Sequence, residues 1–338
     1  MQTRASQVAR PPLKWAGGKR QLLPALAPFY PERFDRYFEP FLGSGAVFFD
    51  LMAGGHLEGR EARLSDVNLD LIGCYTALRD RPDAVIAALA ELEREYQAGG
   101  TDCYYDVRDN RFNPRREAER RVGVAETPLS RPYPADLAAM LIFLNRTDFN
   151  GLFRVNRRGG FNVPAGRYHN PTICDGANLW AVSEAFRHPG VHLEYRRFDA
   201  VLPEAGRGDF VYCDPPYVPL SRTASFASYT ADGFTPLDQA RLLKGVADAC
   251  GRGAAVVVSN SSAEEVVAAY TSPAARQADM RLHRVPARRA INSRASSRGA
   301  VDELIITNVE AGRTIARMPH PPLRMARAAR TERRTRTA

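Results

Sequence analysis

The sequence lacks the features that would place the protein in a membrane or in an oxidising compartment. No run within its 338 residues approaches the ~20 apolar residues that a membrane span needs. The amino terminus has no apolar signal-peptide core. Five scattered cysteines have neither the even number of a disulfide framework nor the spacing of a zinc site. These absences predict a cytoplasmic protein with reduced thiols, no metal ion and no membrane contact.

Two widespread nucleotide-binding patterns are missing as well. The glycine pair beside Lys19 is not a phosphate loop, because the Gly-x4-Gly-Lys-Ser/Thr sequence is absent. The glycine turn at residues 43–45 lacks the third glycine of the dinucleotide pattern, where Phe48 stands instead. The first absence excludes a phosphate-loop enzyme, and the second disfavours a nicotinamide-dependent one.

The sequence does contain an ordinary globular composition with a basic excess. Hydrophobic residues make up 44% and charged residues 25%, and the length suits roughly two domains. The net charge of +9 favours a polyanionic partner. From residue 312 onward, however, eight arginines face one glutamate, a net +7, which leaves +2 for the remainder. We expect residues 312–338 to form a disordered basic tail whose DNA contacts are nonspecific.

The clearest chemical signal is the stretch 209–217. Residues 210–212 are apolar and predict a buried strand, which the following two prolines must end. Asp214, the Pro215 carbonyl and Tyr217 would then lie at the carboxyl end of that strand, where open α/β sheets bind ligands. A carboxylate and a carbonyl can accept the two N–H groups of an amine on a flat heterocycle, and the ring can stack on it. A solvated, proline-rich turn is the simpler alternative.

Three segments nearer the amino terminus have the pattern of ligand-binding turns on the same sheet. Residues 12–20 combine paired glycines with Lys19, which could reach a carboxylate, although alone they would be a turn before a helix. Residues 36–48 predict a strand, a tight turn at Gly43–Gly45 and a helix. About twenty residues later Asp66 ends a second strand, where an acidic side chain can bind ribose hydroxyls. The alternative role for Asp66 is a helix N-cap.

Between residues 76 and 187 the alternation of strands and helices is interrupted. Apolar residues at helical spacing predict helices on either side of the charged segment 110–134, which we expect to be a solvated loop and not a DNA contact. Residues 150–168 predict a β-hairpin around a turn at residues 156–160. A two-stranded ribbon fits the major groove of DNA, although an exposed hairpin with a basic tip is the simpler alternative.

Taken along the chain, with the glycine turn first, the hairpin second and Asp214-Pro-Pro-Tyr217 third, the segments resemble the Dam-type site-specific DNA adenine-N6 methyltransferases (class alpha, D12 family). Asp214-Pro-Pro-Tyr217 looks like their catalytic tetrapeptide. Residues 144–168 are similar, nearly residue for residue, to the recognition hairpin of members that read GATC. The resemblance covers roughly residues 11–309, with a break near residues 115–134. Residues 218–229 and 288–299 resemble family loops near the target base.

The resemblance implies an α/β fold: a Rossmann-like, S-adenosylmethionine-dependent methyltransferase sheet with an inserted helical and β-hairpin target-recognition domain. Residues 1–75 and 188–311 would form the catalytic domain, and residues 76–187 the recognition domain. The enzyme would move a methyl group from S-adenosylmethionine to N6 of an adenine flipped out of duplex DNA, in GATC. We expect a nucleoid-associated monomer on double-stranded DNA, and the resemblance allows a restriction endonuclease as its cognate partner.

It also assigns roles to individual residues. The catalytic residues would be Asp214, Pro215, Pro216 and Tyr217. Cofactor contacts would come from Trp15, Gly17, Lys19, Phe41, Gly43, Gly45, Asp66, Val67, Asp199 and Asp214. DNA contacts would come from Lys14, Phe149, Asn150, Leu152, Arg154, Arg157, Arg158, Pro164, Arg167 and Tyr168. Among these, Arg154 suits a guanine edge, Leu152 a thymine methyl group, and the two tip arginines suit phosphates.

Several alternatives remain open at the level of sequence. The same clamp would fit the exocyclic N4 amine of cytosine, and a catalytically inactive DNA-binding regulator could keep the hairpin. Adenine in structured RNA is disfavoured, because a groove-reading hairpin suits duplex DNA. A small-molecule methyltransferase would not need the hairpin. Cys213 lies on the strand before Asp214, so we expect a core residue and not a nucleophile.

Overall fold

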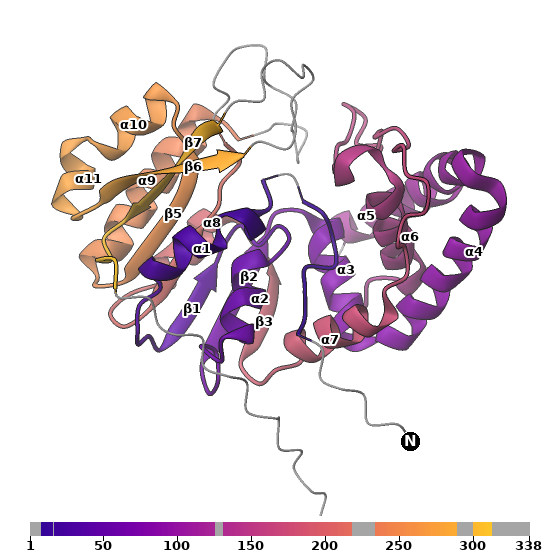
Figure 1. The fold of residues 1–338 in the computed structure, drawn as a ribbon, viewed down its shortest axis with the longest axis horizontal. Coiled ribbons are helices and arrows are strands. Elements are labelled where there is room, and N and C mark those ends of the chain that lie inside the picture. The colour runs from indigo at the N-terminus through magenta and orange to yellow at the C-terminus, as the bar shows by residue number, and fades with distance from the viewer. Residues whose placement is uncertain (1–7, 16, 126–130, 218–233, 289–299, 313–338) are drawn as a thin grey trace, which may run out of the picture.

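A mostly parallel sheet forms the centre of the protein (Figure 1). The computed structural model describes residues 8–312 except residue 16 and the segments 126–130, 218–233 and 289–299. In that part of the chain, seven strands follow the order β3-β2-β1-β4-β5-β7-β6. They are β1 Arg36–Glu39, β2 Glu61–Asp66, β3 Val191–Tyr195, β4 Phe210–Cys213, β5 Ala255–Ser261, β6 Arg281–Arg288 and β7 Ala300–Thr307.

The pairing of the strands is that of a doubly wound fold. Strands β1 to β5 pair in parallel, and β7 runs antiparallel to β5 and β6. This is the dinucleotide-binding order with one antiparallel strand inserted. The predicted Rossmann-like α/β class is therefore confirmed.

Helices cover the sheet and build a lobe beside it. They are α1 Leu23–Leu26, α2 Ala46–Ala53, α3 Leu69–Asp80, α4 Pro82–Asp106, α5 Asn113–Ala125, α6 Ala135–Thr147, α7 Gly176–Phe186, α8 Phe198–Val201, α9 Pro236–Gly251, α10 Glu264–Tyr270 and α11 Pro273–Gln277. Short helical turns are η1 Lys19–Gln21, η2 Ala27–Phe29, η3 Val107–Phe112 (a π-helix), η4 Phe149–Gly151 and η5 Leu202–Glu204. No helix in the described ranges has the length and apolar character to cross a membrane.

The two faces of the sheet bury two separate apolar clusters, because side chains alternate along each strand. Tyr37 and Phe210 point to the face covered by α1, α2, α3 and α7. Phe38 and Val211, their neighbours in sequence, point to the face covered by α8 to α11. The near-continuous apolar run of β4 thus reflects burial on both faces, as expected for a parallel strand.

Helices α4, α5 and α6 form the lobe at the side of the sheet (Figure 1). The apolar residues of α4 and α6 share one core with those of α3, and this core includes Leu89, Tyr104 and Phe143. Helix α3 spans the predicted boundary at residue 75 and connects the second strand of the sheet to this lobe.

The expectation of a solvated loop at residues 110–134 is wrong over most of its length. Residues 113–125 form α5, and the segment 126–130 lies outside the described residues. Helix α5 is joined to α6 and α3 by ion pairs that sequence spacing did not reveal, in addition to a pair at i and i+4 within the helix. Arg115 contacts Asp136 at 3.3 Å and Glu119 at 3.0 Å. Arg116 is buried and its Nε lies 2.6 Å from Asp70 of α3.

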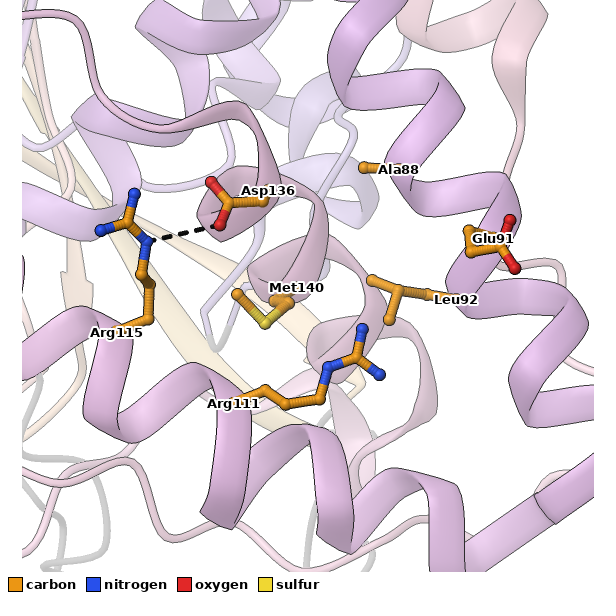
Figure 2. Close-up of a pocket in the computed structure, with 7 residues that line it drawn as sticks. All are labelled: Ala88, Glu91, Leu92, Arg111, Arg115, Asp136 and Met140. Carbon is orange, nitrogen blue, oxygen red and sulfur yellow. Dashed lines mark hydrogen bonds and ion pairs between the residues drawn. The ribbon is translucent and has the colours of Figure 1, made fainter.

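Figure 2 shows the groove that α5 helps to close against α4 and α6. Its volume is about 370 Å³, and Arg115 reaches across it to Asp136. The groove is lined by Ala88, Glu91, Leu92, Arg111, Arg115, Asp136 and Met140. None of these residues belongs to the predicted site, and the two arginines of the groove pair with acids of the lobe, Arg115 with Asp136 and Arg111 with Glu95.

The chain turns back on itself where the hairpin was predicted, but its two arms do not form paired β-strands. The turn is confirmed by hydrogen bonds from the Asn156 amide to the Gly160 carbonyl and from the Gly159 amide to the Asn156 carbonyl, both 2.8 Å. In the described chain its arms make only isolated bridges, between Val155 and Phe161 and between Asp148 and Ala165.

Side chains of the helical lobe take the place of strand pairing. Tyr104 donates a hydrogen bond of 2.7 Å to the Val163 carbonyl, and Arg108 donates one of 3.0 Å to the same oxygen. Asn113 bonds both the amide and the carbonyl of Phe161, at 2.8 and 3.0 Å. The buried backbone of the arm is therefore satisfied by helix side chains, which the hairpin pattern could not indicate.

Candidate active site

The candidate site lies where the strand order reverses between β1 and β4. These strands are paired neighbours, and the chain continues from β1 toward β2 on one side and from β4 toward β5 on the other. Ligands of open α/β sheets bind at the carboxyl ends of the strands at such a switch point. The turn Gly43–Gly45 follows β1, Asp66 ends β2, and Asp214 follows β4. The fold therefore brings three predicted site segments together at the carboxyl ends of these central strands, which we call the catalytic edge.

Asp214 forms an ion pair with Lys19 at the centre of this edge. Lys19 Nζ lies 2.8 Å from Asp214 Oδ1, and the two side chains are only 4% and 19% exposed. The same ammonium group donates a hydrogen bond to the Gly17 carbonyl. Burial raises the pKa of Asp214 to about 6, although Lys19 opposes the rise. A carboxylate in this setting is poorly hydrated and held at a fixed position.

Tyr217 is held by a glutamate that the sequence did not bring to attention. Its hydroxyl donates a hydrogen bond of 3.0 Å to Glu303 on β7. Lys19 lies over the Tyr217 ring, 4.5 Å from its centroid. Glu303 also raises the pKa of Asp214 through its negative charge. The only sequence signal for Glu303 is its place before the apolar run 304–307.

Asp66 is positioned by backbone amides at the end of β2. Its two carboxylate oxygens accept hydrogen bonds from the Gly43 amide at 3.0 Å and the Asn68 amide at 2.9 Å. Burial raises its pKa to about 6, against the lowering effect of these amides. Asn68, and not Asp66, caps α3. Each oxygen keeps a second lone pair, so the carboxylate fits ribose hydroxyls.

The glycine turn packs against Trp15. Gly43 and Gly45 have φ values of +46° and +68°, and a Cβ on Gly43 would lie 2.9 Å from Trp15 Cδ1. Trp15 in turn stacks on Phe153, with centroids 5.7 Å apart. Phe153 belongs to the predicted recognition segment, residues 149–168. The absence of a side chain at Gly43 lets the indole and the backbone meet, as a nucleoside or amino-acid site requires.

Aromatic rings gather behind the turn, where the sequence suggested an acidic contact. Phe41 stacks on Phe198 at 5.2 Å, and Phe234 closes the group at 5.9 Å from Phe41. Asp199 is exposed and pairs with Arg197 at 3.2 Å. Phe198 is thus the residue of this pair that packs against Phe41, which precedes the turn.

A second omitted residue is Glu39, the last residue of β1. It is buried and accepts a hydrogen bond of 2.9 Å from the Tyr37 hydroxyl. Burial raises the pKa of Glu39 well above its ordinary value, and Asp214 and Asp66 add to the rise. Glu39 is therefore a weaker acid than an exposed glutamate and lies close enough to Asp214 and Asp66 to feel their charges. Val67 lies beside Asp66, and Cys213 is fully buried, as expected for a core residue.

The predicted DNA-contacting residues lie on the recognition segment 149–168 and on Lys14. Phe149 is 49% exposed and Tyr168 is 36% exposed, so large aromatic surface faces solvent. Asn150, Arg157, Arg158, Pro164, Arg167 and Lys14 are exposed, and Leu152 is half-buried. The structure brings Lys14 to Tyr168, since its Nζ lies 3.2 Å from the hydroxyl and 4.4 Å from the ring centroid.

Arg154 is oriented by its neighbour across the turn. Its guanidinium donates hydrogen bonds to the Asn162 side-chain oxygen at 2.9 Å and to the Asn162 carbonyl at 3.1 Å. The turn before it is left-handed at Asn150 (φ +63°) and at Gly151 (φ +64°). A Cβ on Gly151 would lie 2.3 Å from Lys14 Cβ, so the amino-terminal segment packs directly on this turn.

Three expectations fall on residues that the structure does not describe. These are the loops at residues 218–229 and 289–299 and the tail from residue 313. All five cysteines are free thiols. Among the described residues, no group of three or more His, Cys, Asp or Glu side chains could hold a metal ion.

Comparison with known proteins agrees with this geometry. The model of the family described as D12 class N6 adenine-specific DNA methyltransferase matches residues 15–291. This chain belongs to that family. Membership makes the protein an adenine-specific DNA methyltransferase and confirms the resemblance seen in the sequence. It favours adenine in DNA over a cytosine amine, structured RNA or a small molecule.

Relatives of this methyltransferase align over most of their own length. The chain is 38% identical to the type II methyltransferase M1.LlaDCHI of Lactococcus lactis subsp. cremoris over 303 residues, 88% of this chain and 95% of the relative. It is 35% identical to the type II methyltransferase M.MjaIII of Methanocaldococcus jannaschii, covering 88% and 99% of the two chains. It is 33% identical to the DNA adenine methylase of Escherichia coli K12, covering 87% and 93%.

Proposed function

We propose that this methyltransferase uses S-adenosylmethionine to methylate N6 of an adenine that is flipped out of duplex DNA, within GATC. The observation that carries the proposal is the buried Lys19–Asp214 pair at the switch point. It lies next to Tyr217 and to the Gly43–Gly45 turn, whose Gly43 amide bonds Asp66. When bound, S-adenosylmethionine supplies a methyl group activated by a sulfonium centre.

The residues around the glycine turn fit that cofactor. Asp66 would accept hydrogen bonds from the ribose hydroxyls, and Lys19 would pair with the carboxylate of the methionine part. Trp15, Phe41 and Phe198 would bury the adenine ring and the apolar parts of the cofactor. Gly17, Gly45, Val67 and Asp199 complete the predicted set.

The catalytic residues would act on the amine of the target base. Asp214 Oδ2 and the Pro215 carbonyl would accept its two N–H groups, and Pro216 would hold this carbonyl in place. These bonds strengthen as the nitrogen becomes tetrahedral and positive, so they lower the barrier to transfer. Tyr217 would stack on the purine and keep it in line for attack.

Sequence selection would come from the recognition segment. Arg154 presents a guanidinium already oriented by Asn162, which suits bidentate bonding to guanine. Leu152 would contact a thymine methyl group, and Phe149 would fill the space left by the extruded base. Arg157 and Arg158 would bind phosphates. Lys14, Asn150, Pro164, Arg167 and Tyr168 complete the surface. In this proposal residues 1–75 and 188–311 form the catalytic domain and residues 76–187 the recognition domain.

A direct test is the state of DNA in a host that expresses the protein. DNA from such a host should resist a nuclease that cuts only unmethylated GATC and yield to one that cuts only methylated GATC. Mass spectrometry of its nucleosides should show N6-methyladenine. N6-methyladenine with GATC still unprotected would overturn the site and leave the reaction. DNA without N6-methyladenine would overturn the reaction itself and leave a DNA-binding regulator.

A further inference from the structure

Arg116 of α5 is a buried cation that connects two regions of the protein. Its Nε pairs with Asp70 at 2.6 Å, and both side chains are less than one-tenth exposed. Its Nη1 donates a hydrogen bond to the carbonyl of Gly159, in the recognition turn. A guanidinium can serve two such partners at once because its donors form a rigid, planar fork.

Asp70 belongs to the helix that supports the cofactor turn. It lies in the first turn of α3, two residues after the Asn68 cap whose amide bonds Asp66. From the same helix, the Tyr75 hydroxyl donates a hydrogen bond of 2.8 Å to the Gly43 carbonyl. Movement of the glycine turn would therefore be transmitted to Asp70 through one continuous helix.

A second route joins the same two regions through aromatic contacts. Arg116 lies over the Phe153 ring, 5.7 Å from its centroid. Phe153 stacks on Trp15, which packs on Gly43. Phe153 is the residue between Leu152 and Arg154. The Trp15–Phe153 stack therefore links the glycine turn to the proposed base-reading positions. Both routes meet at Arg116.

We propose that Arg116 is a positioning residue that couples cofactor binding at the Gly43–Gly45 turn and Asp66 to DNA binding by the recognition segment. The inference rests on the proposed function. Neither Asp70 nor the Gly159 carbonyl can move without disturbing the partner of a buried charge, which is costly. Each ligand therefore favours the same arrangement of the two regions, and by linkage each raises the affinity for the other by the same factor.

The test measures this factor in the full-length protein. The dissociation constant of a duplex oligonucleotide containing one GATC is determined with and without sinefungin, a non-reacting analogue of the cofactor. We expect the analogue to tighten DNA binding about 5- to 150-fold in the natural protein. Arg116→Lys keeps a charge beside Asp70 but loses the fork, so the factor should fall toward one.

Asn113→Ala is the matched control. Asn113 holds the same arm through two hydrogen bonds to the backbone of Phe161, neither of which involves α3, so its loss should weaken DNA binding equally with and without the analogue. A purely structural role for Arg116 would lower stability and both affinities and leave the factor unchanged. If Arg116→Lys does not fold, the charge-free pair Arg116→Met with Asp70→Asn gives the same reading.

The outcomes separate this inference from the proposed function. A factor near one in the natural protein, or an unchanged factor in the Arg116 variants, would overturn the coupling and leave the proposed function standing. Failure of the natural protein to bind either ligand would overturn both. Loss of the factor in the Arg116 variants, with the factor kept in Asn113→Ala, is the result that the geometry predicts.

Discussion

The catalytic edge and the recognition segment are built in opposite ways. At the catalytic edge, Asp214 follows a fully buried strand and is fixed by Lys19, with Tyr217 held by Glu303 from another strand. In the recognition segment, irregular backbone runs over the lobe and is fixed by side chains such as Asn113. The catalytic edge is held in place by paired strands, whereas the recognition segment is held by side chains of the neighbouring helices.

The difference follows from the roles that we propose for the two regions. A transfer reaction requires donor and acceptor groups to be placed within a fraction of an ångström, and paired strands provide this. A surface that reads DNA must keep its polar groups exposed, so it cannot bury both faces of a sheet. Side chains of the lobe satisfy the inner backbone groups of the recognition segment and leave Phe149 exposed and Arg154 partly exposed.

The largest expected effect lies at the catalytic edge. Asp214→Asn keeps the shape of the side chain but removes the charge that stabilises the amine in the transition state. Methyl transfer should fall at least about a hundredfold, as measured with labelled S-adenosylmethionine and a GATC duplex. DNA affinity in a gel-shift assay should change little. An equal loss of binding would place Asp214 in the recognition function and erase the contrast between the regions.

In the recognition segment, Arg154→Ala should change preference more than rate. Loss of its fork should cost about 1–3 kcal/mol of discrimination at one base pair, measured as kcat/KM on duplexes altered at single positions. Asn162→Ala is the matched control, because it removes the group that orients Arg154 and keeps the guanidinium. It should give a smaller loss at the same base pair. An unchanged site preference in Arg154→Ala would remove that residue from the reading set.

The pH dependence separates the two carboxylates of the site. Asp214 has a pKa raised to about 6, so below that pH it takes up a proton and loses its charge. The kcat/KM for DNA, which reports pKa values of the protein before DNA binds, should fall about tenfold per unit below pH 6. Asp66, also near 6, should instead affect the KM for the cofactor.

Glu303→Gln tests this assignment. The amide keeps an oxygen for the Tyr217 hydroxyl but removes the negative charge that raises the pKa of Asp214. The inflection of kcat/KM for DNA should therefore move to lower pH, while that of the cofactor KM should stay in place. An inflection of kcat/KM that does not move would show that Glu303 acts only through Tyr217.

The smallest effect is expected at the basic tip. Changing Arg157 and Arg158 together to Ala should weaken binding to any duplex alike and reduce the salt slope by about two. Deletion of residues 312–338 should also flatten the salt dependence without changing site preference. Titrations at several salt concentrations, with GATC and scrambled duplexes, measure both. A change in preference in either variant would mean that these arginines read bases.

Much of the catalytic edge was predictable because its signals are local. The strand before Asp214, the glycine turn at residues 43–45 and the strand ending at Asp66 follow from short patterns whose backbone needs are met nearby. Glu39 and Glu303 were missed because each becomes relevant only when strands distant in sequence are paired.

The lobe was predicted less well, for a related reason. A run such as residues 113–125 is rich in charge, and local pattern alone indicates a solvated segment. Arg116 can be buried only because Asp70, 46 residues earlier, lies opposite to it. Likewise the recognition segment lost its strand ladder because the lobe supplied other hydrogen-bond partners for Phe161 and Val163.

The sequence by itself indicated the reaction class, because Asp214-Pro-Pro-Tyr217, the glycine turn and the recognition segment are contiguous stretches that together resemble one family of methyltransferases. The tertiary structure decided how these stretches meet. Which buried charges are paired, which aromatic rings join the cofactor turn to the base-reading positions, and which acid faces Tyr217 depend on contacts between residues far apart in the chain. Such contacts form only when the sheet and the lobe are packed together, so no local pattern contains them.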